Sequence, residues 1–180
     1  PVDFADFNFR FILPYAREEL NIPVIYYILP KLWAWRAGRI RTLRRYVDLG
    51  LSILPFETSY FADRGLPSLY IGNPCVDAQL TYRSTHTTET EREQMLLLVP
   101  GSRKSELRDN LPQMLEATVP YTASGWRIVI AGAPGLTAED YAPYLTTHSD
   151  IPILFGDTYG LMCRAHVALV TSGTATLEAG

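Results

Sequence analysis

Two short segments that combine glycine, hydroxyl and charged residues are the strongest candidates for chemistry. The first is Pro100-Gly101-Ser102-Arg103, which follows the apolar run 95–99 and precedes Glu106 by three residues. Glycine lets a backbone approach a ligand closely, N–H groups at a helix start favour an anion, and the arginine fork suits phosphate. We predict a phosphate-binding turn in which Glu106 holds Arg103. The alternative is an ordinary strand-to-helix turn with a solvated arginine.

The second segment, Thr-Ser-Gly-Thr-Ala-Thr-Leu-Glu at residues 171–178, follows the apolar run 166–170. Its small residues can surround a phosphate with N–H and hydroxyl groups, and Glu178, about one turn later, can accept both hydroxyls of a ribose. The alternative is a helix N-cap by Ser172 or Thr174. Parallel strands of one sheet end at the same edge, so we expect both turns to face one crevice. Neither turn matches a P-loop, and the sequence holds no G-x-G-x-x-G.

Asp3, with Asp6 and Asn8 close behind it, is the third candidate. A carboxylate at a strand end can act as a general base, although the residue types alone favour a turn or a helix cap.

The fourth candidate is the run Trp33-Ala34-Trp35-Arg36. It lies in the segment 31–45, which holds six lysines and arginines and no acid. Aromatic side chains beside arginine suit a membrane interface or an anionic lipid headgroup. A partly buried tryptophan pair beside a solvated basic face is the alternative.

Short apolar runs alternate with helical patterns along the chain, which predicts parallel β-sheets covered on both faces by helices. We expect strands at 24–29, 49–54, 68–71, 95–99, 126–131, 151–155 and 166–170. Helices are expected at 39–46, 57–64, 137–145 and 159–165, and Pro112 is expected in the first turn of a new helix. The Thr-rich stretch without hydrophobic period predicts a connector at 81–93, between one unit at 1–80 and another at 94–180.

Composition excludes several classes of function. The net charge of −3 argues against a nucleic-acid-binding protein, which would need a strongly basic domain. No apolar run approaches the roughly 20 residues of a membrane-spanning helix. Cys75 and Cys163 have no near partner, and the three histidines show no ligand spacing, so we expect no metal and no cofactor. Two lone cysteines fit a reducing compartment. The chain lacks an initiator methionine and stops where a helix begins, so we expect an internal piece of a larger protein.

Taken in order, the motifs of this chain resemble lipid-A-disaccharide synthase over essentially its whole length. They are Val-Asp-Phe-Ala-Asp-Phe-Asn at 2–8, Leu-Trp-Ala-Trp-Arg at 32–36, Leu-Pro-Phe-Glu at 54–57, Ile-Gly-Asn-Pro at 71–74 with Val-Asp at 76–77, Val-Pro-Gly-Ser-Arg at 99–103 with Glu106, and the run 171–178. The resemblance implies a GT-B fold of two Rossmann-like parallel-sheet domains, both incomplete here. Residues 1–80 would end the N-terminal, acceptor-side domain, and 94–180 would begin the C-terminal, UDP-sugar donor domain.

The resemblance also implies an activity. The family is an inverting glycosyltransferase that joins UDP-2,3-diacylglucosamine to 2,3-diacylglucosamine 1-phosphate, giving lipid A disaccharide phosphate and UDP without a metal. It is a cytoplasmic enzyme, peripheral to the inner face of the cytoplasmic membrane of Gram-negative bacteria. The isolated piece would be inactive. Unpaired strand edges of a cut sheet would favour a homo-oligomer.

Residue by residue, the resemblance makes Asp3 the general base and Arg103 the residue that stabilises the leaving diphosphate. The donor would be bound by Gly101, Ser102, Arg103, Ser172, Gly173, Thr174, Ala175 and Glu178. Trp33, Trp35 and Arg36 would lie on the acceptor or membrane side. The alternatives are another GT-B enzyme, such as the peptidoglycan N-acetylglucosaminyltransferase or a UDP-sugar epimerase, and a non-catalytic nucleotide-binding fragment.

Overall fold

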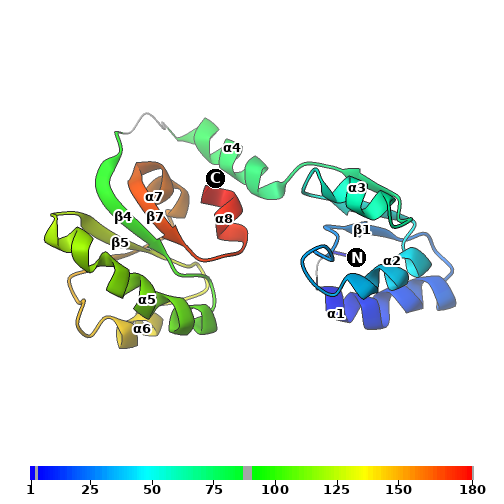
Figure 1. Cartoon of the computed structure of the whole chain (residues 1–180), viewed down its shortest axis with the longest axis horizontal. Helices are drawn as coiled ribbons and strands as arrows, with labels where there is room; N and C mark the ends of the chain where they lie inside the picture. The colour runs from blue at the N-terminus through cyan, green and yellow to red at the C-terminus, as the bar shows by residue number, and fades with distance from the viewer. Residues whose placement is uncertain (3, 87–90, 180) are drawn as a thin grey trace. The chain divides into compact units, whose positions relative to one another are not determined.

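The structure is a computed structural model that describes residues 1–2, 4–86 and 91–179. It divides into two compact units, Pro1–Pro74 and Cys75–Gly180, and each contains its own β-sheet (Figure 1). All strand pairs within the two sheets are parallel. The predicted α/β class with parallel sheets is therefore confirmed.

The first unit is built on a three-stranded sheet in the order β1-β2-β3. Its strands and α-helices in chain order are α1 (Ala5–Phe7), β1 (Ile25–Tyr27), α2 (Ile40–Tyr46), β2 (Leu49–Ser52), α3 (Glu57–Ala62) and β3 (Ser68–Tyr70). Two π-helical stretches, Asn8–Ile12 and Tyr15–Glu19, continue from α1, and a 3-10 turn at Ala37–Arg39 precedes α2. The core gathers Leu13, Tyr26, Leu43 and Phe61, each 0% exposed.

The second unit is built on a four-stranded sheet in the order β6-β5-β4-β7. Its strands and α-helices in chain order are α4 (Pro74–Thr85), β4 (Glu93–Val99), α5 (Lys104–Ala123), β5 (Arg127–Gly132), α6 (Ala138–Tyr141), β6 (Ile153–Phe155), α7 (Thr158–Arg164), β7 (Ala165–Val170) and α8 (Thr174–Ala179). A 3-10 turn at Ala142–Tyr144 follows α6.

Helices cover both faces of this second sheet, as the continuous apolar run of β4 predicts. Leu96 and Leu98 point to one face, where they meet the apolar side of α5. Leu97 and its alternate neighbours point to the other face, where Leu161 of α7 packs. In Figure 1, α5 and α6 lie on one side of the sheet and α7 on the other. The crossover order brings the end of β4 next to the end of β7.

The expectation for Pro112 is wrong. The helix α5 runs without interruption from Lys104 to Ala123 and contains both Pro112 and Pro120. A proline inside a helix removes a backbone hydrogen bond and costs about 3 kcal/mol. Four residues of α5 are buried, Leu107, Leu111, Leu115 and Thr118. The three leucines belong to the apolar core of the second unit, and this burial favours the helix despite its two prolines.

The predicted connector at 81–93 begins within a helix. Residues up to Thr85 belong to α4, and β4 starts at Glu93. Residues 87–90 lie outside the described part of the chain. The threonines of α4 do not prevent the helix, because it is held by tertiary contacts. One of them joins the Tyr82 ring of α4 to the Tyr159 ring, with the ring centroids 5.5 Å apart. The division between the two compact units falls after Pro74, ahead of the expected connector.

Candidate functional site

A cavity of about 390 Å³ lies in the second unit, where β4 and β7 end side by side. Thr171 N–H donates to the Val99 carbonyl at 2.9 Å, which ties the two strand ends together. The volume is in the range of small-molecule sites. The lining comprises Val99, Gly101, Ser102, Arg103, Glu106, Ala131, Ala133, Pro134, Thr158, Thr171, Ser172, Gly173, Ala175 and Glu178. The prediction that both turns face one crevice is confirmed.

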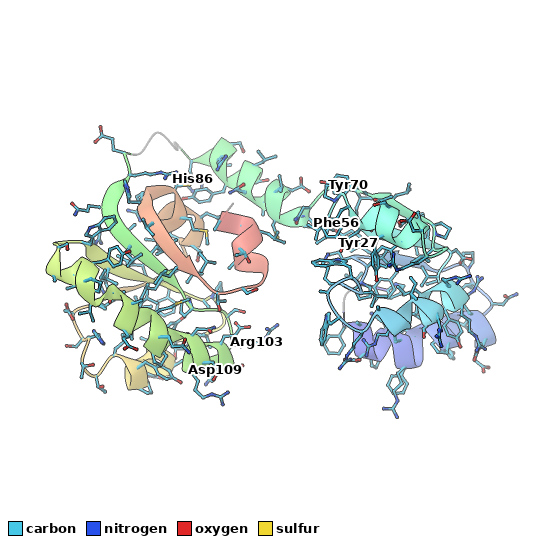
Figure 2. The ribbon with its side chains drawn as sticks, in the orientation of Figure 1. Tyr27, Phe56, Tyr70, His86, Arg103 and Asp109 are labelled. Atoms are coloured by element: carbon cyan, nitrogen blue, oxygen red, sulfur yellow. The ribbon has the colours of Figure 1, made fainter. Side chains whose placement is uncertain are left out.

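Arg103 lines this cavity and lies immediately before α5 (Figure 2). Its Nη1 donates to Glu106 Oε1 at 2.8 Å, so Glu106 holds it as predicted. The Arg103 side chain is nevertheless 76% exposed. A guanidinium has five N–H donors, so one contact to Glu106 leaves donors for a bound anion.

The backbone of the same turn differs from the expectation. Glu106 Oε2 accepts the N–H groups of Ser102 at 2.7 Å and Arg103 at 3.2 Å. These two donors are therefore already bound to the Glu106 carboxylate. The group of this turn that remains for a ligand is mainly the Arg103 guanidinium. The Ser102 N–H, assisted by the Arg103 backbone and guanidinium, holds the pKa of Glu106 below its ordinary range against the opposing effect of burial.

Gly101 is required by this arrangement. Its φ of +117° lies in the region that favours glycine. A Cβ atom at this position would also lie 2.6 Å from Glu106 Cβ, closer than real contacts allow. The glycine thus admits the carboxylate that orders the turn.

The turn after β7 is ordered by its own hydroxyl group. Gly173 has φ +143°, and its N–H donates to Thr176 Oγ1 at 3.1 Å. Ser172 and Gly173 are exposed at the cavity, with Ala175 at the start of α8 partly exposed. Thr174 follows in the backbone as the first residue of α8. Ser172, Gly173 and Ala175 of the predicted segment therefore line the same cavity as Arg103.

Asn110 joins the two turns, and sequence reasoning missed it. Its Nδ2 donates to Thr171 Oγ1 at 2.6 Å and to the Pro100 carbonyl at 3.2 Å. A signal did exist, because Asn110 follows Arg103 by seven residues, which is two turns along the same face of a helix. One amide on α5 thereby links the two turns beyond the backbone pairing of their strands.

Glu178 reaches the cavity from α8 and is partly buried. Its Oε1 accepts the hydroxyl of Tyr159 at 3.1 Å, and Gln79 Nε2 donates to its backbone carbonyl at 3.1 Å. Neither Tyr159 nor Gln79 was predicted, since neither belongs to a recognisable motif.

Trp33, Trp35 and Arg36 are surface residues of the first unit. The tryptophans are 43% and 64% exposed, and the Arg36 guanidinium lies 4.9 Å from the Trp35 ring centroid. Trp33 meets Phe56 edge-on at 5.1 Å. The run thus presents an aromatic and cationic surface.

A buried carboxylate, which the sequence did not single out as chemical, anchors this surface. The side chain of Glu57 is 0% exposed. Its Oε1 accepts from Lys31 Nζ and from Trp33 Nε1, each at 2.9 Å. Its Oε2 accepts the Leu54 N–H at 3.2 Å. Glu57 therefore fixes the loop that carries the tryptophans.

Asp3 lies outside the described residues, whereas its neighbour Asp6 is described. Asp6 is paired with both Arg36 and Arg39. The hydrogen bond from Arg39, with further help from Arg36, lowers the pKa of Asp6. The Asp6 carboxylate therefore forms surface ion pairs with these two arginines.

Within the described ranges, no group of three or more His, Cys, Asp or Glu side chains could hold a metal ion. Over the same residues, no helix is both long enough and apolar enough to cross a membrane.

Comparison with known proteins gives one consistent family. The family model described as lipid-A-disaccharide synthetase matches residues 1–180. Among curated proteins, the chain is 39% identical to the lipid-A-disaccharide synthase of Myxococcus xanthus, over 99% of the chain and 48% of the relative. It is 38% identical to that of Anaeromyxobacter dehalogenans and 33% identical to that of Saccharophagus degradans, with the same coverage. The chain therefore spans about half the length of these relatives.

Proposed function

This chain belongs to the lipid-A-disaccharide synthase family, and on that premise we propose that its protein is an inverting glycosyltransferase of lipid A synthesis. The donor is UDP-2,3-diacylglucosamine and the acceptor 2,3-diacylglucosamine 1-phosphate. The acceptor 6-hydroxyl attacks the anomeric carbon of the donor, and the bond from that carbon to the diphosphate breaks. UDP leaves with the bonding electrons, and the hydroxyl proton passes to a base.

The second unit would bind the donor. Arg103 would pair with the diphosphate and stabilise the charge that develops as UDP leaves. Gly101, Ser102 and the segment 172–175 would surround the phosphates, and Glu178 would accept the ribose hydroxyls. The observation that supports this proposal is that Arg103, the small-residue turn and Glu178 all line one cavity.

The first unit would serve the acceptor. By resemblance, Asp3 is the general base that takes the proton of the acceptor hydroxyl. Trp33, Trp35 and Arg36 would lie toward the acceptor or the membrane, where exposed aromatic rings beside a cation suit a lipid headgroup region. We therefore propose that the protein works in the cytoplasm, peripheral to the inner face of the cytoplasmic membrane.

The experiment is a transfer assay with labelled donor on the intact protein, paired with calorimetry of UDP. Asp3→Asn keeps the shape of the side chain but cannot accept the proton as a carboxylate does. We expect normal UDP affinity and a loss of turnover of roughly 100-fold or more. Normal turnover would refute the base assignment. Transfer from UDP-N-acetylglucosamine, with none from the diacylated donor, would favour the peptidoglycan type of enzyme instead.

A further inference from the structure

A hydrogen bond reaches Glu178 from a residue that does not line the cavity. Tyr159 on α7 donates its hydroxyl to Glu178 Oε1 at 3.1 Å. In the described part of the chain, the cavity lining includes Glu178 but not Tyr159, which instead lines a neighbouring hollow that Glu178 also borders. Tyr159 can therefore act on a ligand in the cavity only through the carboxylate.

Tyr159 is itself held from two directions. The Tyr82 ring of α4 lies 5.5 Å from the Tyr159 ring, and the Tyr82 hydroxyl donates to Asp157 Oδ1 at 3.0 Å. Asp157 caps α7 by accepting the Gly160 N–H at 3.1 Å. Burial, followed by the bond to Glu178, raises the pKa of Tyr159, so its hydroxyl stays protonated at neutral pH. The phenol is thus a fixed donor.

The backbone of Glu178 is fixed as well. Gln79 on α4 donates its Nε2 to the Glu178 carbonyl at 3.1 Å. Main chain and side chain of Glu178 are therefore each tied to a different helix. These two hydrogen bonds restrict Glu178 to one orientation before a ligand binds. An unrestrained glutamate would instead lose rotamer entropy on binding.

We propose that Tyr159 is a positioning residue that orients the Glu178 carboxylate toward the two hydroxyls of the donor ribose. This inference rests on the proposed UDP-sugar function. A carboxylate has about four acceptor positions, and one phenol hydroxyl occupies one of them. The remaining positions can accept both ribose hydroxyls, which makes the ligand class a ribonucleoside diphosphate with a free vicinal diol.

The test compares UDP with 2′,3′-dideoxy-UDP by calorimetry on the intact protein and its Tyr159→Phe variant. Phenylalanine keeps the ring packing and removes only the hydroxyl. One net hydrogen bond is worth about 0.5–1.5 kcal/mol, so we expect UDP affinity to fall about 2- to 12-fold. The affinity for 2′,3′-dideoxy-UDP should not change, because that ligand has no diol for Glu178 to bind.

Two further variants sharpen the test. Tyr121→Phe alters an exposed tyrosine at the far end of α5 and should leave both affinities unchanged. Adding Tyr159→Phe to Glu178→Ala should cause no further loss, because residues that act through one group are not additive.

The outcomes separate the two proposals. If wild type prefers UDP over 2′,3′-dideoxy-UDP and Tyr159→Phe keeps that preference in full, the positioning role is overturned while the donor site stands. Equal losses for both ligands would show a merely structural role and overturn it too. If wild type binds neither ligand, the proposed function fails, and the positioning role fails with it.

Discussion

The side-chain amide of Asn110 lies 2.6 Å from Thr171 Oγ1, across 61 residues of sequence. The same amide reaches the Pro100 carbonyl at 3.2 Å. The turn that carries Arg103 and the turn that begins α8 are thus joined by one group on α5. The link therefore joins two turns that both contribute to the lining of the cavity.

Replacing Asn110 with leucine should weaken UDP binding. The change leaves two partly buried oxygens without a donor, each at a cost of about 1–3 kcal/mol if water does not replace it. Because the two turns also lose their link, we expect a roughly three- to tenfold loss of UDP affinity. Calorimetry measures it. Gln113→Leu, an exposed position on the same helix, is the matched control and should bind UDP as wild type does. Equal affinity for Asn110→Leu and wild type would show that the link does not shape the site.

Glu106 predicts an acid-dependent stability of the second unit. Its folded pKa is lowered, with the Ser102 N–H as the largest cause. A carboxylate with a depressed folded pKa stabilises the protein above its unfolded value of about 4.3, and this contribution is lost as the pH falls through the folded pKa. Wild type should therefore lose more stability than Glu106→Gln between about pH 6 and pH 3. Urea midpoints at several pH values measure the difference.

The control for that experiment is Glu116→Gln, which alters an exposed carboxylate farther along α5. The loss of stability of this variant between about pH 6 and pH 3 should match that of wild type. If Glu106→Gln shows the same loss as wild type, the turn is not held together by the ionised carboxylate.

Glu57 should be a stability determinant of the first unit. Removing one partner of a buried ion pair costs about 3–5 kcal/mol, and the cost here should be at or below about 3 kcal/mol because the Lys31 side chain is 31% exposed. Glu57→Ala should thus lower the free energy of unfolding and alter tryptophan fluorescence, since Trp33 loses its acceptor. Glu18→Ala removes an exposed partner of Arg45 and should cost below about 1 kcal/mol. Similar losses for both variants would contradict the anchoring role.

The sequence predicted the parts of the site that depend on local pattern. Strand ends followed by Gly101 or Gly173 placed both turns at one sheet edge, because parallel strands share that edge. The Arg103–Glu106 pair was also predictable, since residues three apart face each other on a helix.

The remaining features depend on contacts between distant residues. Tyr159 and Glu178 come from different helices, and Lys31 and Glu57 are 26 residues apart. The hydrophobic periodicity of a sequence does not predict contacts between residues so far apart along the chain. Pro112 was misjudged because helix propensity was weighed without the burial of α5. The helical start of the 81–93 segment was missed because Tyr82 is held by tertiary contacts.

The central claim is that the cavity between the two turns of the second unit binds UDP through Arg103. Arg103→Ala, compared with Arg108→Ala, tests it most directly by calorimetric titration of UDP. Arg108 lies one turn further on α5, is paired with Asp109, and is 69% exposed. A hydrogen bond to a charged group contributes about 1.5–3 kcal/mol, so Arg103→Ala should bind UDP roughly 10- to 150-fold more weakly while Arg108→Ala binds normally. Equal UDP affinity in wild type and Arg103→Ala would contradict the claim.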